Sequence, residues 1–525
     1  MALQLREVPL QLGEDEELLP SRVARALGIR EADILSWKIL RLGIDARRKP
    51  DVLRVYTVEF TVADEAGLLA VQGDNPALVV SEPPLVAEII RLKIRPQILV
   101  VGMGPAGLFC ALQLAEAGCK VTLLERGKPV VERLQDVQRF WSGGPLNPES
   151  NIQFGEGGAG TFSDGKLTSR LNHPLMRQVL ETLVRFGAPE EILWQAKPHV
   201  GSDRLRPVLV NFRKHLVAKG VQIRFSTRLT GIETREGRIR AGVTDDAESL
   251  PCEQLVLAVG HSARDTYRML NEAGVTLEAK PFAIGLRVEH PLELINRIQY
   301  GREKHPQLPA AEYNLAWNDS QTGRGIYSFC MCPGGLVVNS SSEEGGIVVN
   351  GMSNYRRDGE FSNAALVVSV KPEDFPGRQV LAGIEFQRRW ERAAYLAAGG
   401  NWNAPAQPLL EFLGKRGGRL HSSCQPRVVH ADLTGCLPDF VVAELRQALP
   451  HFDRRMRGFV GPEATLIGVE TRTSAPLRIV RNEAGESVSH SGLYPTGEGA
   501  GYAGGIMSAA LDGLRTANHI LDRYL

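Results

Sequence analysis

The sequence contains little cysteine for its length and no strong excess of charge of either sign. Seven cysteines among 525 residues are too few for a disulfide scaffold, which favours a reducing, cytoplasmic setting. The formal net charge of +1 gives no strong signal for nucleic acid or an anionic membrane surface. The N-terminal stretch lacks the apolar core of a signal peptide, and no run of about 18 apolar residues predicts a membrane span.

Several catalytic patterns are also missing. The sequence has no G-x-S-x-G turn for a hydrolase nucleophile and no cysteine–histidine spacing typical of zinc. A second G-x-G-x-x-G with its own strand and helix is absent. We therefore expect no separate NAD(P)H domain, although NAD(P)H remains possible as a transient reductant. The hydrophobic fraction of 43% is ordinary for a globular protein.

A complete dinucleotide-binding pattern is present near residue 100. Ile98–Val101 is typical of a short buried strand, and Gly102, Gly104 and Gly107 form a G-x-G-x-x-G turn before a helix. Gly102 permits the sharp turn, Gly104 lets the backbone approach a pyrophosphate, and Gly107 lets the helix pack closely. The helix N-terminus adds partial positive charge for the phosphates.

The second strand of this pattern ends in an acid. Glu125 closes Val121–Leu124, eighteen positions after Gly107. A carboxylate there can accept both hydroxyls of an adenosine ribose and would repel a 2′-phosphate. The alternative is a glycine turn that only permits close packing. The flanking strands, the helix and the acid together predict dinucleotide binding.

A second glycine-rich segment covers residues 492–513 and is typical of a strand end, a loop and a helix that starts near Gly505. This ending resembles that of flavoproteins of the glutathione-reductase structural type. The resemblance implies that Glu498 or its neighbour binds a ribityl hydroxyl and that the helix start faces the flavin pyrimidine edge. A helix N-terminus carries roughly half a positive charge, so it would favour the reduced flavin.

Other segments agree with flavin binding. Residues 255–261 resemble the strand-then-glycine element beneath the cofactor of these flavoproteins. Residues 225–232 resemble the strand that meets the adenine, with Leu229 as the contact. Residues 153–167 are so dense in glycine that their amides could reach the pyrophosphate or the isoalloxazine edge, although a surface loop is the alternative.

The motifs VGMGPAG with LLERG, FGEGGAGTFSDGKL, SFCMCPGG, GVETRTSAPLRI and YPTGEGAGYAGGIMSAA carry a family resemblance. Over nearly its whole length the chain resembles the uncharacterised bacterial FAD-dependent dehydrogenases, relatives of the glutathione-reductase-type flavoproteins. The resemblance implies bound FAD, a three-layer nucleotide fold and an inserted substrate domain. The predicted FAD contacts are Gly102, Gly104, Pro105, Ala106, Gly107, Glu125, Arg126, Gly157, Gly158, Ala159, Lys166, Leu167, Leu229, Ala258, Gly260, Gly497, Glu498, Gly504, Gly505 and Ile506.

The predicted fold class is α/β, with a Rossmann-like three-layer FAD-binding domain. It has a small N-terminal α/β domain (1–95), an FAD-binding domain in two parts (96–280 and 461–525) and an inserted, mainly antiparallel β-sheet substrate domain (281–460). Strands are predicted over 3–10, 34–44, 52–62, 221–225, 255–259, 282–289, 325–329, 335–339 and 346–350. Helices are predicted over 21–27, 169–186, 208–219, 379–398 and 439–449, with 77–94 as a connection.

Candidate reacting groups lie in three places. Glu470 and Arg472 alternate and could share a strand face, where the arginine could hold a substrate carboxylate; a structural ion pair is the alternative. His261 could be a general acid or base, or a structural histidine. Cys330 and Cys332 could face the flavin as a redox pair, but a C-x-C bridge would be strained, which favours a packing role.

The sequence thus predicts an oxidoreductase with non-covalent FAD that moves hydride between flavin N5 and an unidentified small-molecule substrate. The alternative is a flavin-binding scaffold whose N-terminal module recruits a protein or RNA partner. The scaffold is supported by a basic cluster that could be a docking surface for an acidic partner; the alternative is an ordinary solvated hairpin tip. The cluster consists of Arg41, Arg47, Arg48, Lys49 and Arg54.

Overall fold

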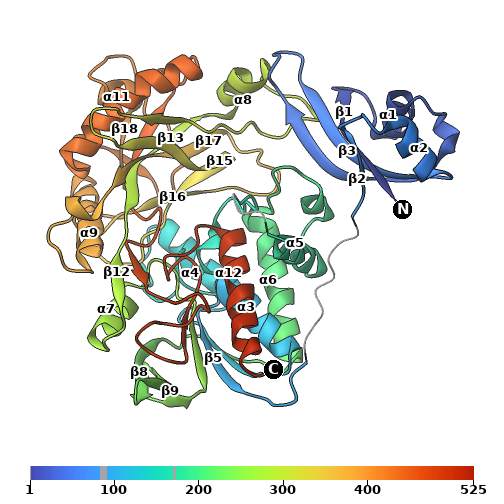
Figure 1. The fold of residues 1–525 in the computed structure, drawn as a ribbon. Helices are drawn as coiled ribbons and strands as arrows, with labels where there is room; N and C mark the ends of the chain where they lie inside the picture. The colour runs from blue at the N-terminus through green and yellow to red at the C-terminus, as the bar shows by residue number, and fades with distance from the viewer. Residues whose placement is uncertain (1, 83–90, 170–172) are drawn as a thin grey trace.

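The structure is a computed structural model that describes residues 2–82, 91–169 and 173–525. Three sheet-based units are visible in Figure 1: an N-terminal module, a nucleotide-binding unit that includes the C-terminal helix, and an inserted sheet. The N-terminal module stands to one side, next to the inserted sheet and the helix α8 (Leu292–Tyr300). Among the described residues, no helix is long and apolar enough to cross a bilayer.

The N-terminal module is a four-stranded sheet in the order β2-β3-β1-β4. Every second residue of β3 is buried, and these side chains pack with the apolar stripe of α1. Its elements are β1 (Leu3–Gln11), α1 (Leu19–Leu27), β2 (Ile34–Asp45), β3 (Leu53–Val62), α2 (Glu65–Gln72) and β4 (Leu78–Val80). The predicted pairing of 34–44 with 52–62 is confirmed.

The nucleotide-binding unit is built on a five-stranded parallel sheet in the order β22-β11-β5-β6-β7. These strands are β5 (Gln97–Val101), β6 (Lys120–Leu124), β7 (Gln222–Arg224), β11 (Gln254–Leu257) and β22 (Leu493–Pro495). The helices are α3 (Pro105–Glu116), α4 (Val130–Trp141), α5 (Leu175–Arg185), α6 (Gly201–Ala218), α7 (Arg264–Glu272) and α12 (Ile506–Asp522). In Figure 1, α3 and α12 stand side by side.

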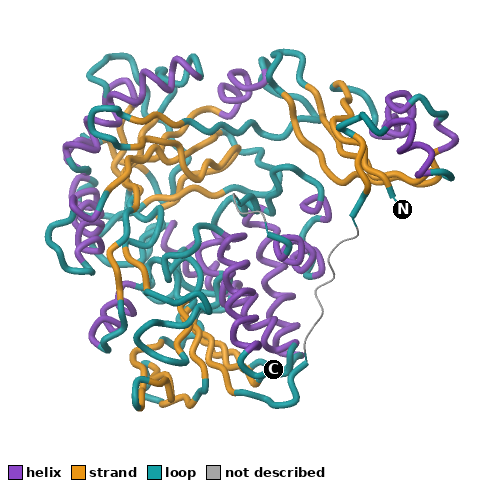
Figure 2. The backbone as a smooth tube through the Cα atoms, viewed as in Figure 1, coloured by secondary structure: helices purple, strands orange, loops and turns teal. Residues whose placement is uncertain are grey.

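Successive side chains of the parallel strands point to opposite faces of the sheet, so a separate core lies on each face. Val100 of β5 and its neighbours on one face pack with α3, α5, α6 and α12, while Leu99 and Val101 face the other way. The second face packs with a three-stranded antiparallel sheet of β8 (Leu229–Arg235), β9 (Arg238–Thr244) and β10 (Ser249–Pro251). Figure 2 shows these strands below the helical cluster. The unit therefore has three layers: helices, parallel sheet and antiparallel sheet.

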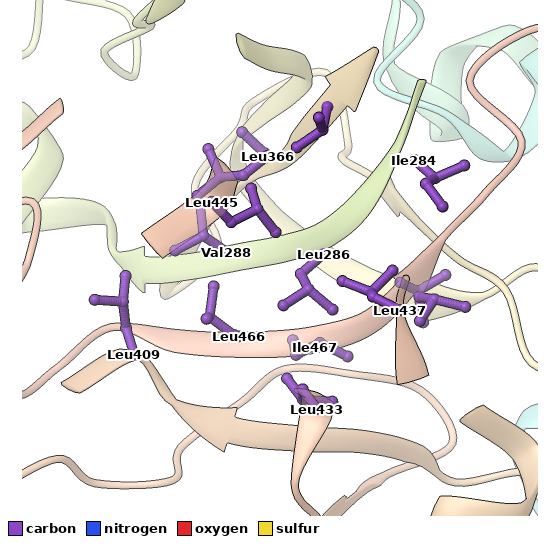
Figure 3. Packing of buried hydrophobic residues seen from close by; sticks show 14 of the residues in the cluster. Ile284, Leu286, Val288, Leu366, Leu409, Leu433, Leu437, Leu445, Leu466 and Ile467 are labelled. Carbon is purple, nitrogen blue, oxygen red and sulfur yellow. The ribbon is translucent and has the colours of Figure 1, made fainter. Parts of the chain in front are cut away.

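The inserted unit is an eight-stranded sheet that is antiparallel except between β18 and β19. Figure 3 shows Ile284, Leu286 and Val288 along β13, with Val288 beside Leu445 of α11 and near Leu466 of β20. The strands are β13 (Phe282–Pro291), β14 (Ala316–Asn318), β15 (Gly325–Asn339), β16 (Val349–Met352), β17 (Phe361–Val370), β18 (Ala404–Pro408), β19 (Val428–His430) and β20 (Thr465–Glu470). The helices, besides α8, are α9 (Ala382–Ala397), α10 (Leu409–Phe412) and α11 (Asp439–Arg455); β12 (Leu277–Ala279) and β21 (Leu477–Ile479) form a separate pair.

Several predicted boundaries differ from the structure. The helix predicted over 208–219 begins at Gly201, the helix predicted over 439–449 continues to Arg455, and the strand predicted over 346–350 is Val349–Met352. β20 pairs with β13 and β18, so the chain leaves the inserted sheet after residue 470 rather than at 460. The strands predicted over 325–329 and 335–339 are one strand, β15, because bulges carry the chain through without a break. The helix predicted over 169–186 begins after Pro174, which disfavours helix before it, and residues 170–172 lie outside the described chain. Within 77–94, β4 pairs with β1, and residues 83–90 are not described.

Candidate active site

One cavity lies where the parallel sheet, the glycine-rich run 153–167 and the C-terminal loop face the inserted sheet. Its volume is about 1520 Å³ when the open mouth is included. The wall on the nucleotide side comes from the β5–α3 turn, the ends of β6 and β11, and the start of β8. The opposite wall comes from β15, β16 and the end of β20. Segments far apart in the sequence therefore enclose one space.

The β5–α3 turn has the geometry that its glycine pattern predicts. Gly102 has a φ of +101°, and a Cβ there would overlap the carbonyl oxygen of Ala258 at the end of β11. A Cβ on Gly107 would overlap the carbonyl oxygen of Gly102, so this glycine sets the close packing of α3. No side chain among the described residues caps α3 at Gly104. The start of α3 is therefore open to an anionic ligand.

Glu125 lines the cavity at the end of β6 and also ties together three segments. Its carboxylate accepts the backbone amides of Met103, Gly127 and Gly155, each at 2.9 Å. The sequence did not reveal this role. A carboxylate offers about four lone-pair sites, so part of its capacity remains for a ligand. Its contact with both ribose hydroxyls stays a prediction.

The glycine-rich run packs against the β5–α3 turn. Gly158 has a φ of +61°, and a Cβ on it would lie 3.0 Å from the Cα of Gly104. The fully buried Arg133 of α4 holds the run from behind, since its guanidinium donates to three backbone carbonyls between residues 151 and 156 at 2.7 to 2.8 Å. Sequence reasoning missed Arg133, because nothing in a helical stretch marks an arginine that points inward.

The C-terminal loop reaches the same cavity. β22 lies parallel to β11, and a Cβ on Gly499 would overlap the backbone of Gly260. The buried carboxylate of Asp512 accepts the Gly497 amide at 2.7 Å, which fixes the loop to α12. The Glu498 carboxylate accepts the Gly505 amide at 3.3 Å, and among the described residues no further side chain caps the first turn of α12. A second open helix start therefore faces the cavity.

Glu498 and His261 are neighbours in the cavity wall, with 3.9 Å between Oε1 and Nε2. Burial raises the pKa of Glu498 to about 7. Burial, with the positive charges of Arg472 and Arg264, lowers the pKa of His261 to about 3. The imidazole of His261 is therefore neutral near pH 7, and the neighbouring Glu498 is the group of the two whose pKa lies there. A general acid or base role for His261 stays a prediction.

Arg472 and Glu470 both line the cavity, but other side chains bind their charged groups. Arg472 donates from Nε and Nη2 to the two oxygens of Glu391 at 2.9 and 2.8 Å, and from Nη1 to Ser342 at 2.6 Å. Glu470 accepts two hydrogen bonds from Arg287 at 2.8 and 3.1 Å. Both residues are in structural ion pairs. The predicted shared strand face is wrong, because β20 ends at Glu470.

The partner of Arg472 belongs to a larger buried cluster. Arg264 of α7 donates to both oxygens of Glu391 of α9, at 2.7 and 3.0 Å. Burial alone would raise the pKa of Glu391, but Arg264 and Arg472 hold it well below its usual range. This cluster, Arg264–Glu391–Arg472, joins the nucleotide-binding unit to the inserted sheet beside the cavity.

Most of the predicted cofactor contacts lie in the cavity wall. They are Gly102, Gly104, Pro105, Ala106, Glu125, Arg126, Gly158, Ala159, Lys166, Leu229, Ala258, Gly260, Glu498, Gly505 and Ile506. Five do not line it: Gly107, Gly157, Leu167, Gly497 and Gly504. Gly107 packs behind the turn, and Leu167 is 2% exposed within the core of the helical layer.

The inserted sheet supplies wall residues whose position the sequence could not fix. Phe329, Cys330 and Asn350 line the cavity, and Phe329 is a large aromatic side chain that is 37% exposed. Pairing of β15 with β16 and β17 brings these residues to the site, and such pairings leave no local sequence signal. Across the described ranges, no group of three or more His, Cys, Asp or Glu could hold a metal ion.

Comparisons with known proteins identify the family. Residues 97–156 match an FAD binding domain, residues 281–473 match "FAD-dependent protein, C-terminal domain-like", and residues 3–61 match a domain of unknown function. A protein of Clostridium beijerinckii described as uncharacterized is 44% identical over 534 residues, which cover 100% of this chain and 99% of that protein. The chain belongs to the FAD-dependent protein family.

More distant relatives of this FAD-dependent protein match only part of the chain or match its structure weakly. Aklavinone 12-hydroxylase DnrF of Streptomyces peucetius is 30% identical over 159 residues, 28% of this chain and 31% of that protein. The FAD complex of glycerol-3-phosphate dehydrogenase from Bacillus halodurans has a TM-score of 0.36 and 10% identity over 82% of this chain and 64% of that chain. Likenesses this low establish no shared activity.

The cofactor of this FAD-dependent protein is FAD, and the protein is a flavoprotein of the oxidoreductase class. The described residues fit the cofactor in two ways. The close approach of Gly104 and Gly158 forms a cradle that a Cβ would fill. Two open helix starts, those of α3 and α12, border one cavity, which suits a ligand with a pyrophosphate and an electron-rich ring.

Proposed function

We propose that the protein is a dehydrogenase that moves hydride between an unidentified small-molecule substrate and flavin N5. The observation that supports this most is the cavity at the β5–α3 turn, which is bounded by the nucleotide-binding unit on one side and the inserted sheet on the other. The three-layer unit would be a Rossmann-like FAD-binding domain related to glutathione-reductase-type flavoproteins. The inserted sheet would be the substrate domain.

The cavity wall offers a group for each part of FAD. The turn at Gly104 and Gly158 would hold the pyrophosphate, Glu125 and Leu229 would meet the adenosine, and Glu498 would bind a ribityl hydroxyl. When bound, FAD supplies the hydride chemistry. The protein supplies orientation, and the start of α12 adds partial positive charge where the reduced ring is electron-rich.

Charged side chains of the cavity divide into structural and titrating groups. Arg472 and Glu470 are held in ion pairs, so we do not assign them to the substrate. His261 stays neutral at pH 7 and can accept or donate a hydrogen bond without carrying charge. Glu498, with a pKa of about 7, can hold or release a proton beside the start of α12.

Anaerobic spectroscopy tests the dehydrogenase proposal. The purified protein should be yellow, and at least one organic donor should bleach the flavin absorbance; NADH and NADPH belong in the panel as transient reductants. A colourless protein that stays colourless with added FAD would contradict the proposal. So would a yellow protein whose flavin only dithionite reduces.

The scaffold alternative has less support in the structure. Its basic cluster is divided: Arg54 is 6% exposed, and Lys49 donates to the carbonyl of Ile298 in α8 at 2.6 Å. Arg302 donates to the carbonyl of Pro50 at 3.0 Å, so the hairpin tip is hydrogen-bonded to the inserted unit. Tight partner binding that needs residues 1–95, together with a flavin that no organic donor reduces, would revive the scaffold.

A further inference from the structure

Cys330 differs from the other cysteines in its exposure. It is partly exposed and lines the cavity, on the strand that faces the nucleotide-binding unit. The remaining six cysteines are buried, and one of them, Cys332, lies two residues further along β15. Packing explains a buried cysteine. It does not explain a thiol that borders a cofactor cavity.

The backbone at Cys330 adopts a conformation that non-glycine residues avoid. Its φ is +45°, and the pairing of β15 with β17 shifts register between Phe329 and Cys332. A left-handed conformation costs about 1–2 kcal/mol, and a bulge re-aims a side chain. The buried guanidinium of Arg287 donates to the Cys330 carbonyl at 3.2 Å and so supports this conformation.

The two side chains influence each other's protonation. Cys332 lowers the pKa of Cys330, whereas Cys330 and burial raise the pKa of Cys332 well above its usual value. The thiol of Cys332 also points at the Cys330 carbonyl, with 3.6 Å between Sγ and oxygen. A Cβ on Gly351 would lie 2.8 Å from Cys332 Sγ, so this glycine leaves room for the sulfur. Cys330, the residue of the pair whose thiol pKa is lowered, is the one that lines the cavity.

We propose that Cys330 and Cys332 form a dithiol–disulfide pair that exchanges two electrons with the bound flavin. The proposal rests on the proposed function and adds a second redox group to the same site. When the pair is oxidised, two S–H bonds break and one S–S bond forms. Two electrons and one proton then go to oxidised flavin, and the second proton goes to solvent.

The favoured direction follows from the spacing of the pair. A disulfide between residues two apart is strained, and strained disulfides have higher reduction potentials. The bridge should therefore accept electrons from reduced flavin: the S–S bond breaks, and two thiols form with the proton carried by the flavin and one from solvent.

Peptide mapping of the holoprotein tests whether the bridge exists. The tryptic peptide 325–356 contains both cysteines and no others. After mild oxidation with diamide and alkylation in denaturant, we expect this peptide to stay unalkylated and to lack two hydrogens. After anaerobic reduction with dithionite, both thiols should alkylate. Alkylation of both thiols in the oxidised sample would overturn the proposal.

Electron counting tests whether the pair communicates with the flavin. In an anaerobic dithionite titration, oxidised wild-type holoprotein should take up two more electrons per FAD than Cys330→Ser or Cys332→Ser. Cys252→Ala, a buried cysteine outside the cavity wall, is the matched control and should behave as wild type. Cys330→Ser alone decides the result if Cys332→Ser does not fold.

Failure of this proposal is distinguishable from failure of the proposed function. Equal electron uptake by wild type and Cys330→Ser would contradict the redox role of the thiol pair, but it would leave the proposed dehydrogenase activity intact. A flavin that no organic donor bleaches would contradict the dehydrogenase, even if the peptide and the electron count were as expected.

Discussion

At the scale of single residues, the guanidinium of Arg472 belongs to a buried ion pair. Arg472→Ala should lower the free energy of unfolding by about 3 kcal/mol, because Glu391 loses one of its two buried cationic partners. The flavin spectrum of the folded variant should be unchanged. Urea unfolding monitored by fluorescence measures the first effect.

The matched control is an exposed ion pair that joins α7 to α9, as the buried Arg264–Glu391 pair does. Arg268→Ala breaks the ion pair with Glu385, in which the two side chains are 48% and 54% exposed. It should change the free energy of unfolding by less than about 1 kcal/mol. If Arg472→Ala kept full stability and lost reduction by the true substrate, Arg472 would bind that substrate after all.

Glu498 links stability to pH. The folded protein keeps its proton up to a pKa of about 7, whereas the unfolded chain loses it near 4.5. The folded state therefore binds more protons in this window, and stability falls as pH rises through it, by up to about 3 kcal/mol. Without FAD, Glu498→Gln should match wild type near pH 4 and be more stable at pH 8. A stability difference that does not vary with pH would contradict this burial effect.

At the scale of elements, the close approach of the glycine-rich run to the β5–α3 turn should control FAD affinity. Gly158→Ala places a Cβ 3.0 Å from the Cα of Gly104 at a left-handed position. We expect FAD binding to weaken about tenfold, which corresponds to about 1.4 kcal/mol. Equilibrium titration of the protein freed of FAD measures this affinity.

Gly220→Ala separates strain from cofactor binding. Gly220 also has a positive φ of +84°, but a Cβ there would meet nothing within 4 Å. The Gly220→Ala substitution should lower the free energy of unfolding by about 1 kcal/mol and leave FAD affinity unchanged. Equal losses of affinity in both variants would mean that Gly158 acts through stability alone.

Elements whose signals are local could be predicted from the sequence, and long-range pairings could not. The turn at Gly102 and the helix start at Gly505 follow from glycine spacing and short-range periodicity. β20 was placed with the wrong sheet, because its apolar residues fit a buried strand of either unit. Glu391 as the partner of Arg472 lies 81 residues away and leaves no trace in the spacing.

At the scale of the whole molecule, the two walls of the cavity differ in the same way: one depends on local sequence signals, and the other depends on long-range pairing. On the nucleotide side, fifteen of the twenty predicted cofactor contacts line the cavity, because the glycine pattern and the acid mark that wall locally; their contact with FAD stays a prediction. The facing wall, with Phe329 and Asn350, depends on how the inserted sheet docks, which the buried Arg264–Glu391–Arg472 cluster helps to fix. Nothing in the local sequence around Phe329 encodes that docking.

The most direct test of the central claim is a crystal structure of the protein with FAD bound. We predict one FAD that spans the cavity, with its pyrophosphate at the turn of Gly102 and Gly104 and its isoalloxazine ring beside Ile506 at the start of α12. A cofactor bound elsewhere, or one that touches the turn while its ring lies away from α12, would contradict the claim that these distant segments form one flavin site.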